Sequence, residues 1–461
     1  MTQVKHQRQG KNRYNLRMSD DASPSTYAPF IALALVLVLF VLALVGLIVT
    51  AVIIFVFTSS APVAANPLVA NGAPLNRLAV IDANRIYTSA PDGSDQIDLK
   101  HTGQVPTAGL IWSHDGRRLL FVETERNISR LISAQPAGDA PLILFETDRL
   151  SAPFYLNGSP DDRSVAFLIP SARNAMELQV AQTDRPNLAR LALAGQPNYS
   201  SWSPDSRSLL VHIGGDQADA FVGTAALDGA QPTKLEMRPA AFQAPVWLPD
   251  AADTWLYARQ QGARSELVLN AAGAIETLAT LEGGVAFTLA ANGQQVAYSL
   301  NTPDSFLYNN LTVIDLATRA PQTIYKGNLV AFFWSPDSQK IAYLTGALVA
   351  PGIIGRVGGL AAPARPQGQR VLQLTWHVIE LSTGRAVELT TFEPTESFIY
   401  LLTYFDQFAQ STAVWSPDSR SLVYTGTPLI GKRGVYVVDT QHPDGSPRFI
   451  GPGDFAIWSW H

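Results

Sequence analysis

The stretch AVWSPDSRSLVYTG, residues Ala413–Gly426, decides whether this chain is read as a catalytic site or as a structural repeat. Within it, Ser416 and Asp418 lie close together beside an arginine, as a catalytic or ion-binding cluster would require. The pattern recurs, however. Further copies are WSHDGRRLLF from Trp112, WSPDSRSLLV from Trp202 and WSPDSQKIAY from Trp334. A segment that recurs along most of a chain is better explained by architecture than by chemistry.

Degenerate copies complete a regular series. The first positions of all copies are Trp112, Gly158, Trp202, Trp247, Leu289, Trp334, Trp415 and Trp458. Successive positions in this series differ by 46, 44, 45, 42, 45, 81 and 43. A period of about 40 to 45 residues is typical of propeller blades with four strands each. The sixth spacing is nearly twice the others, which indicates inserted sequence.

Each repeat contains four strand patterns. After Leu289 these read QQVAYSL, NLTVIDLAT, PQTIYKG and LVAFFWS, rich in β-branched and aromatic residues and bounded by turn formers. No long helical period occurs between Arg77 and His461, so an all-β, antiparallel propeller is predicted. The chain starts with the second, third and fourth strands of a blade and ends with an innermost strand, FAIWSWH, which would close the ring. We expect eight blades, or seven if the divergent region at Trp247 forms no complete blade.

The repeated motif has a structural explanation. A large residue at the end of the innermost strand can fill the wedge between blades, proline presets φ for the turn, and aspartate accepts hydrogen bonds from turn N–H groups. The residues assigned to this structural motif are Trp112, Asp115, Asp161, Trp202, Pro204, Asp205, Trp247, Asp250, Trp334, Pro336, Asp337, Trp415, Pro417, Asp418 and Trp458. One carboxylate per blade does not converge on a shared site, so the motif predicts neither a calcium site nor a catalytic one.

These residues resemble the TolB-type, WD-like β-propeller repeat family, whose blades carry the same W-S-P-D-G/S-x-x-I/L-A/V-F/Y signature. The resemblance covers roughly Arg77–His461 and implies a propeller fold. It implies no particular function, because similar blades occur in periplasmic TolB, in the propellers of prolyl oligopeptidases and dipeptidyl peptidases, and in bacterial surface proteins. TolB also has an α/β domain before its propeller, whereas only a linker precedes the repeats in this chain.

An apolar segment lies outside the repeats. Phe30–Phe57 is an uninterrupted run without a charge, and as a helix it would be longer than the hydrocarbon core of a bilayer is thick. Five cations precede it and the next charge is Arg77, so the amino terminus is predicted to be cytoplasmic. We expect a basic tail (1–28), a transmembrane helix (29–57), a linker (58–76) and a propeller (77–461), single-pass in the plasma membrane with the propeller extracytoplasmic, at the cell surface or in the periplasm. A cleaved signal peptide is the alternative, although the apolar run is long for one.

Two insertions account for the doubled spacing, at 346–370 and 393–410. In an up-and-down blade both emerge on one face of the ring, here called the insertion face, and the Trp-Ser-Pro-Asp turns emerge on the opposite turn face. Because the linker meets a second strand, the turn face is predicted to lie nearer the membrane. The candidate partner-binding patch on the insertion face is Ile353, Ile354, Arg356, Tyr400, Tyr404, Phe405 and Lys432. An alternative for the second insertion is a short amphipathic helix that packs its aromatic residues on the blade and caps the channel.

Enzymatic motifs are not found. The chain has no G-x-S-x-G elbow, no H-E-x-x-H and no cysteine, and its GTPLIGK match to a P-loop at Gly426 is followed by a strand pattern where a helix should begin. Net charge is −5 without a basic stripe in the repeats, which argues against nucleic acid. The expected function is a non-catalytic, membrane-tethered scaffold that binds a protein or peptide, with no cofactor. The alternative class is a sensor of a small ligand or glycan, or a hydrolase that uses the channel.

Overall fold

The computed structural model describes residues 76–460 except 107–108, 137–140, 172–174, 187–188, 216, 229–231, 236–237, 241–242, 302–306 and 350–369. The chain divides into two compact units, Met1–Thr58 and Ser59–His461, and every described residue belongs to the second. The predicted tail, the transmembrane helix 29–57 and all of the linker but Asn76 lie outside the described residues. Among the described residues, no helix is long and apolar enough to cross a membrane.

The described strands form seven antiparallel sheets, six of four strands and one of seven. The first sheet joins both ends of the repeat region: β1 (Leu78–Asp82), β2 (Arg85–Ser89), β3 (Ile97–Asp98) and β31 (Phe455–Trp458). The next three are β4 (Leu110–Trp112), β5 (Leu119–Glu125), β6 (Ile128–Ala134) and β7 (Leu142–Asp148); β8 (Phe154–Gly158), β9 (Ser164–Ser171), β10 (Ala175–Gln182) and β11 (Ala189–Gly195); and β12 (Asn198–Trp202), β13 (Ser208–Ile213), β14 (Phe221–Ala226) and β15 (Thr233–Lys234).

The remaining sheets follow the same order. They are β16 (Val246–Leu248), β17 (Ala251–Gln261), β18 (Arg264–Ala271) and β19 (Ala274–Leu281); β20 (Val285–Leu289), β21 (Gln295–Asn301), β22 (Tyr308–Asp315) and β23 (Pro321–Leu329); and the seven-stranded β24 (Ala331–Trp334), β25 (Lys340–Val349), β26 (Val371–Glu380), β27 (Ala386–Pro394), β28 (Ser421–Pro428), β29 (Gly434–Asp439) and β30 (Arg448–Gly451). The described residues also form three short helices: η1 (Arg149–Ser151), α2 (Glu396–Thr403) and α3 (Phe405–Phe408).

The seven-stranded sheet contains two repeats. Its β24–β27 half joins the β28–β30 half through a short ladder from Phe392 to Pro394, and the segment at Trp415 reaches β28 through a bridge to Leu422. The divergent region at Trp247 forms a complete sheet, β16–β19, so the reason for expecting only seven blades is removed.

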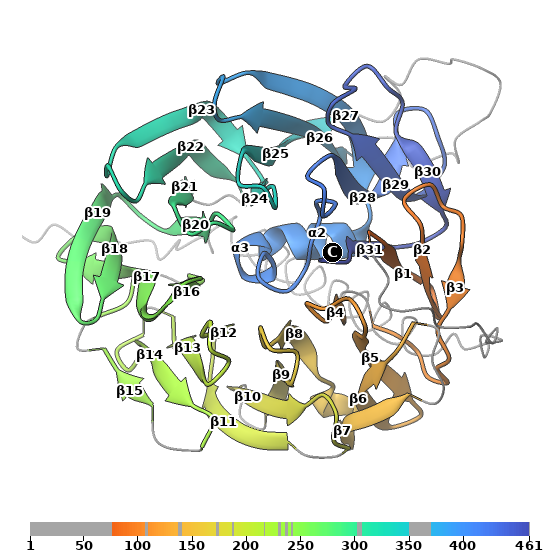
Figure 1. Cartoon of the computed structure of the whole chain (residues 1–461), viewed down its shortest axis with the longest axis horizontal. Helices are drawn as coiled ribbons and strands as arrows, with labels where there is room; N and C mark the ends of the chain where they lie inside the picture. Colours follow the sequence, from red (N-terminus) through yellow and green to blue (C-terminus); the bar gives the residue numbers. More distant parts are fainter. Residues whose placement is uncertain are drawn as a thin grey trace, which may run out of the picture. The chain divides into compact units, whose positions relative to one another are not determined.

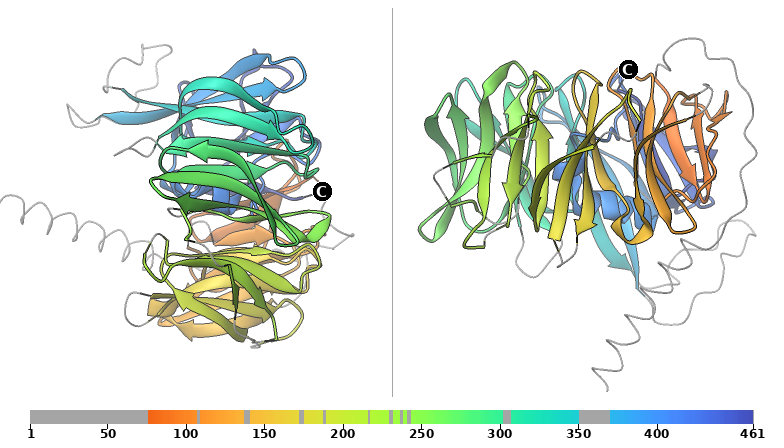
Figure 2. Two further views of the ribbon diagram at one scale, coloured as in Figure 1. Left: turned by 90° about the vertical axis from the view of Figure 1, so that its left-hand side faces the viewer. Right: turned by 90° about the horizontal axis from the view of Figure 1, so that it is seen from below.

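The sheets stand around a common centre, with the innermost positions taken by the first strand of each sheet or, in the sheet of β1–β3, by β31 (Figure 1). Their strands run between the two faces of the ring (Figure 2). The predicted closure is confirmed, because β31 supplies the innermost strand for β1 in the register Leu78↔Trp458 to Ile81↔Phe455. Closure leaves no free sheet edge at the seam. The apolar core lies between neighbouring sheets and extends into the centre of the ring.

Hydrogen bonds explain why the motif forms a tight turn. In the last copy, Ser416 Oγ donates to Asp418 Oδ1 (2.6 Å), the same carboxylate oxygen accepts from Arg420 N (3.1 Å), and Ser416 Oγ accepts from Ser421 N (2.8 Å). The corresponding serine–aspartate bonds are repeated at Ser113–Asp115, Ser159–Asp161, Ser203–Asp205 and Ser335–Asp337. The aspartate carboxylates therefore accept the hydrogen bonds that the hydroxyl and N–H groups of their own turns donate.

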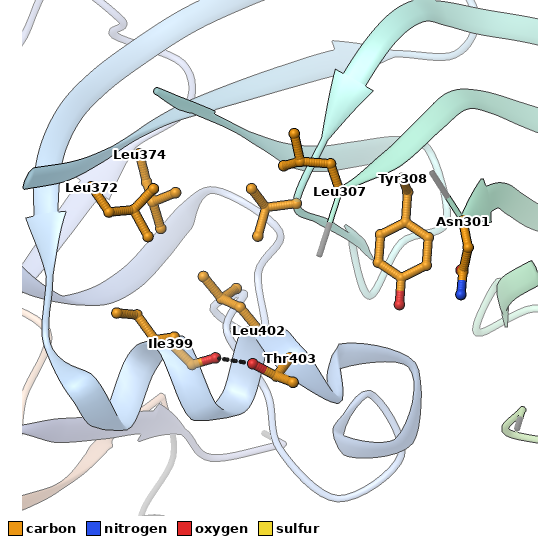
Figure 3. Close-up of a pocket in the computed structure, with 9 residues that line it drawn as sticks. Asn301, Leu307, Tyr308, Leu372, Leu374, Ile399, Leu402 and Thr403 are labelled. Atoms are coloured by element: carbon orange, nitrogen blue, oxygen red, sulfur yellow. Dashed lines mark hydrogen bonds between the residues drawn. The ribbon is translucent and has the colours of Figure 1, made fainter. Parts of the chain in front are cut away.

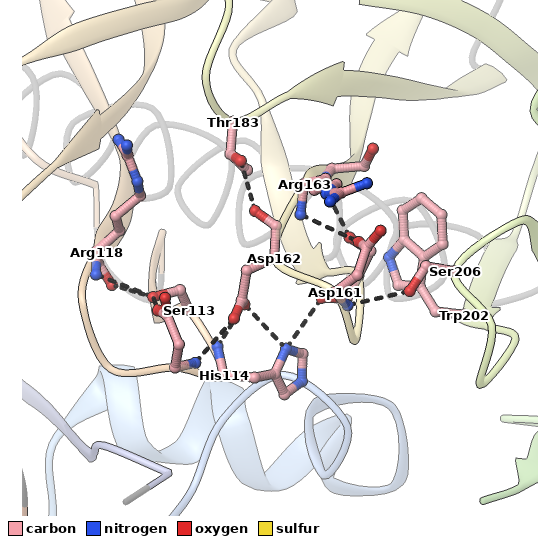
Figure 4. A network of polar contacts seen from close by, with 12 residues as sticks. Ser113, His114, Arg118, Asp161, Asp162, Arg163, Thr183, Trp202 and Ser206 are labelled. Atoms are coloured by element: carbon pink, nitrogen blue, oxygen red, sulfur yellow. Dashed lines mark hydrogen bonds and ion pairs between the residues drawn. The ribbon is translucent and has the colours of Figure 1, made fainter. Parts of the chain in front are cut away.

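The fifth motif position adds a bond between neighbouring repeats. Its residues have left-handed φ values of 58° to 67° and are Gly116, Asp162, Ser206, Gly293, Ser338 and Ser419. Side chains at this position accept hydrogen bonds from backbone N–H groups of the preceding repeat; for example, Ser206 Oγ accepts from Asp161 N at 3.0 Å. Asp162 accepts from two N–H groups, those of His114 (2.6 Å) and Asp115 (2.9 Å) (Figure 4). These bonds clamp adjacent sheets on the turn face.

The motif tryptophans bond across the same boundary. In four of the copies the indole Nε1 donates to a backbone carbonyl on the innermost strand of the preceding repeat, at 2.9 to 3.2 Å; the pairs are Trp202–Asn157, Trp247–Ser201, Trp334–Thr288 and Trp415–Phe333. Trp112 and Trp458 are also buried, but among the described residues their indole Nε1 atoms have no hydrogen-bond partner. In the four bonded copies, the buried ring fills the wedge between sheets and its N–H is paired.

Candidate functional site

Helices α2 and α3, here called the insert, lie inside the ring of sheets (Figure 1). The insert begins at Thr395, whose hydroxyl accepts from Phe398 N (3.2 Å) and donates to the Asp454 carbonyl (2.8 Å). Its apolar residues recur every three or four positions, and Phe398, Leu401 and Leu402 are buried together on one side of α2. A threonine cap and this spacing explain why a helix forms in an otherwise all-β chain.

Phe405 anchors α3 to the surrounding strands. Its side chain is completely buried, with its ring centroid 4.9 Å from that of Phe332, 5.4 Å from Tyr308 and 5.9 Å from Phe333. Helix α3 contacts β20 and β24, where Ala286 and Ala331 stand three residues before the motif position. Small residues at these two positions leave room for the helix.

Tyrosines occupy the equivalent positions in two other repeats. Tyr155 and Tyr199 stand three residues before Gly158 and Trp202, and their ring centroids are 5.8 Å apart. Tyr155 also packs edge-on against Phe408, with centroids 5.6 Å apart, and its hydroxyl donates to the Gln407 carbonyl (3.3 Å). Together these contacts hold α3 between opposite sides of the ring.

A carboxyl group is buried in the middle of this packing. Asp406 is 8% exposed, and burial raises its pKa to about 7, against a smaller lowering effect of the Gln407 backbone N–H, which donates to Oδ1 (3.0 Å). Burial is likewise the main cause that raises the pKa of Tyr155, Tyr199 and Tyr308, and the charge of Asp406 contributes to each increase. The centre of the ring therefore contains phenols around one acid.

An apolar pocket of about 290 Å³ lies beside α2 (Figure 3). Its lining residues come from β21, β22 and the segment before it, β26, α2 and the residue before β24: Asn301, Leu307, Tyr308, Val330, Leu372, Leu374, Ile399, Leu402 and Thr403. The Thr403 hydroxyl donates to the Ile399 carbonyl (2.9 Å), so aliphatic carbon provides most of the remaining surface. Such a lining suits an apolar side chain or other aliphatic group.

Exposed apolar side chains gather on the insertion face. Of the large apolar residues exposed in the described part of the chain, eight belong to connections on this face: Ile128, Leu150, Leu348, Ile399, Tyr400, Tyr404, Leu429 and Ile430. Ile275, on the β18–β19 turn, lies on the turn face. A localised excess of exposed apolar residues is typical of an interaction surface.

The structure divides the candidate patch. Tyr400 and Tyr404 are 41% and 39% exposed, and their ring centroids are 5.4 Å apart. Lys432 lies in the β28–β29 loop with its ammonium 4.0 Å from the Phe449 ring centroid. Phe405 does not belong to the patch, because its complete burial removes it from the surface. Ile353, Ile354 and Arg356 lie outside the described residues.

The lining residues of the pocket and Asp406 were not identified from the sequence. Leu372 and Leu374 alternate along β26, a period-two signal that shows they share one side of a strand but not that α2 faces them. Asp406 stands between aromatic residues in the sequence, and an acidic residue within such an apolar run is the signal from which a buried carboxyl could have been predicted. Within the described ranges, no group of three or more histidine, aspartate or glutamate side chains could hold a metal ion.

Comparisons with known proteins give weak likenesses only. No protein-family model matches the chain, and no curated protein matches it. TolB from Acinetobacter baumannii is similar at 14% identity and a TM-score of 0.35, over 53% of this chain and 62% of that one. Oligogalacturonate lyase from Vibrio parahaemolyticus is similar at 12% identity and a TM-score of 0.42, over 75% of this chain and 86% of that one. A protein from Lactobacillus plantarum is similar at 15% identity and a TM-score of 0.42, over 68% of this chain and 95% of that one. At these scores the neighbours say nothing about activity, and the fold assignment stands on the sheets described above.

Proposed function

We propose that this protein is a membrane-tethered, extracytoplasmic propeller of eight blades, related to TolB-type propellers, that docks a protein or peptide on its insertion face without catalysing a reaction. The concentration of exposed apolar side chains on that face is the observation that carries the proposal. Protein interfaces are enriched in tyrosine and in apolar anchors that enter pockets on the partner.

The docking site is centred on α2. Ile399 lines the pocket and is partly exposed; Tyr400 follows it directly and Tyr404 lies about one turn further along the insert, both outside the pocket lining. One apolar side chain of the partner would enter the pocket between α2 and β26, while the two tyrosines cover its surroundings. This arrangement combines a small apolar cavity with exposed aromatic residues on the same helical insert, as binding hot spots do.

The filled centre of the ring supports docking over channel chemistry. Phe405, Phe408 and Tyr155 pack against one another or against neighbouring strands in the place where a substrate would have to converge with polar groups. A ligand that entered the channel would first have to displace this packing. A partner that binds the exposed side of the insert would not have to displace this packing.

The side on which the chain reaches the ring supports the predicted orientation. Arg77 N donates to Ser459 Oγ (3.0 Å), and Ser459 N donates to the Arg77 carbonyl (2.8 Å), at the turn-face end of β1 and β31. A tether attached there favours a turn face near the bilayer. The insertion face would then point away from the membrane, toward soluble or surface partners.

Site-specific photocrosslinking in native membranes tests the proposal. A photoreactive residue at Tyr404 is compared with one at Asp205 on the turn face, each combined with Ile399→Glu or with Ile275→Glu. The two isoleucines are a matched pair, 37% and 46% exposed on opposite faces. We expect a discrete protein adduct at position 404 that Ile399→Glu abolishes and Ile275→Glu preserves.

Two outcomes would contradict docking at this site. An adduct at position 404 that survives Ile399→Glu would mean that the pocket does not select the partner. Saturable glycan binding by the purified full-length protein, or turnover of ester, glycoside or peptide substrates, would instead support the alternative class of sensor or channel hydrolase.

A further inference from the structure

Asp406 sits at the point where the insert enters the centre of the ring. It belongs to α3, between Phe405, which packs on Phe332, and Gln407, whose carbonyl accepts from Tyr155. Among the described residues, its carboxyl accepts one hydrogen bond from another residue, donated by the Gln407 N–H. Helix α3 thus carries an ionisable group into a largely apolar seat.

The titratable groups that interact with this carboxyl, among the described residues, are phenols. Tyr155 comes from β8, Tyr199 from β12 and Tyr308 from β22, and burial raises the pKa of each above its usual range. Strands β20 and β24 also pack against α3, and their residues VAFTL and AFFW contain no titratable group. Among the described residues, no cationic side chain acts on Asp406, so this carboxyl is the group in the seat that titrates between pH 4 and pH 8.

We infer that Asp406 makes the seating of the insert pH-dependent: the neutral carboxyl holds α3 in the centre of the ring, and the carboxylate favours its release. A neutral acid is tolerated among tyrosine and phenylalanine rings, whereas an ion there is largely removed from bulk water and has no counter-charge among the described residues. Release would return the ion to water. The insert's first turn would remain attached, because Thr395 is bonded to Asp454 and Phe398 is buried against Phe392.

This switch reaches the surface through α2. Ile399, Leu402 and Thr403 line the pocket, and they lie a few residues before Asp406 on the same insert. Displacement of α3 would therefore loosen one wall of the pocket. This part of the inference rests on the proposed docking function, and it makes docking stronger in an acidic compartment than at pH 8.

The size and direction of the effect follow from proton linkage. A carboxyl with its usual pKa of 3.8 in the released insert and about 7 in the seated insert binds its proton more tightly when seated. Seating is unaffected below pH 4, weakens as pH rises toward 7, and is constant above that. The equilibrium shifts toward release by up to tenfold per pH unit and about 10³-fold in total.

Hydrogen exchange of the full-length protein in detergent micelles measures this equilibrium. The informative amides are those of Phe408, Ala409 and Thr412, which donate to the carbonyls of Tyr404, Phe405 and Phe408. After correction for intrinsic exchange rates, their protection should fall by up to tenfold per unit between pH 5 and pH 7. Amides of β17 and β18, on a distant sheet, should show no such change and serve as the internal reference.

Asp406→Asn is the matched variant, since it keeps the shape of the side chain and removes its titration. Its insert amides should keep the same protection from pH 5 to pH 8. A pH dependence of equal size in the variant, or none in the natural protein relative to β17 and β18, would overturn the inference. Because the comparison with β17 and β18 uses the natural protein, the test holds even if the variant does not fold. The outcome is independent of whether a docking partner exists.

Discussion

Truncation of Phe405 to alanine probes how the insert is held, and it separates a buried anchor from a surface contact. The side chain is completely buried and its ring lies 4.9 to 5.9 Å from three other aromatic rings. Removal of a buried phenylalanine costs about 3 to 5 kcal/mol through lost burial and the cavity that remains. Since α3 is short and its remaining contacts cannot close a ring-sized space, we expect a loss in the upper part of that range, about 4 kcal/mol.

Urea unfolding followed by tryptophan fluorescence gives the free energy of unfolding from the midpoint and slope. The neighbouring Tyr404→Ala is the control, because that side chain is 39% exposed and its loss should cost less than about 1 kcal/mol. A loss below about 1 kcal/mol for Phe405→Ala, or equal losses for the two variants, would refute the claim that Phe405 anchors the insert.

Three further predictions concern contacts between repeats, each measured as a change in the urea midpoint. Ser206→Ala removes the hydroxyl that accepts a hydrogen bond from Asp161 N in the preceding repeat, and it keeps a left-handed φ of 61°, so the free energy of unfolding should fall by about 1 to 2 kcal/mol. Ser206→Gly should lower it less, because glycine adopts this φ without strain. A larger loss for glycine than for alanine would contradict the role given to φ. Trp202→Phe leaves a buried carbonyl without its indole donor, and should cost about 1 to 3 kcal/mol. Gly293→Ala would place a Cβ atom 2.8 Å from Pro249 Cδ at a φ of 67°, so a loss of about 1 to 3 kcal/mol is expected; an unchanged midpoint would show that the two repeats can separate.

Sheet order and ring closure could be predicted because both are written in local patterns that repeat. Each strand has its own alternation, each turn has its own aspartate, and the period fixes where the next innermost strand begins. The pairing of the two ends followed by counting strand patterns, because the first repeat begins without an innermost strand and the last pattern is an innermost strand alone; β31 does pair with β1. No knowledge of distant contacts was required.

The inter-repeat role of the fifth motif position could not be predicted in this way. Serine at this position is an ordinary turn residue, and the structure shows that the hydroxyls of Ser206, Ser338 and Ser419 also accept hydrogen bonds from backbone N–H groups of the preceding repeat. Those bonds join residues that are a full repeat or more apart in the chain. A local turn preference explains the same residue equally well, so the sequence contained no separate signal for the clamp.

The insert shows a different limit. Its spacing of apolar residues predicts one buried side, and the alternative of an amphipathic helix packed on the blade agrees with the burial of Phe398, Leu401 and Phe408. The spacing of apolar residues does not determine which surface, of this protein or of a partner, covers the buried side of the insert. Phe405 was therefore assigned to a partner, whereas the centre of the ring covers it.

The position of the insert explains why the proposed site lies at its rim. Wide rings leave a central space, and in this chain side chains of the insert occupy it: Phe405 and Phe408 pack inward, and Tyr400 and Tyr404 remain outside. One short segment thus closes the channel and provides the exposed aromatic surface. A substitution that weakens its inner side must also move its outer side. Loss of docking in Phe405→Ala would consequently report an indirect effect, whereas loss in Ile399→Glu, at the surface, would report direct contact with the partner.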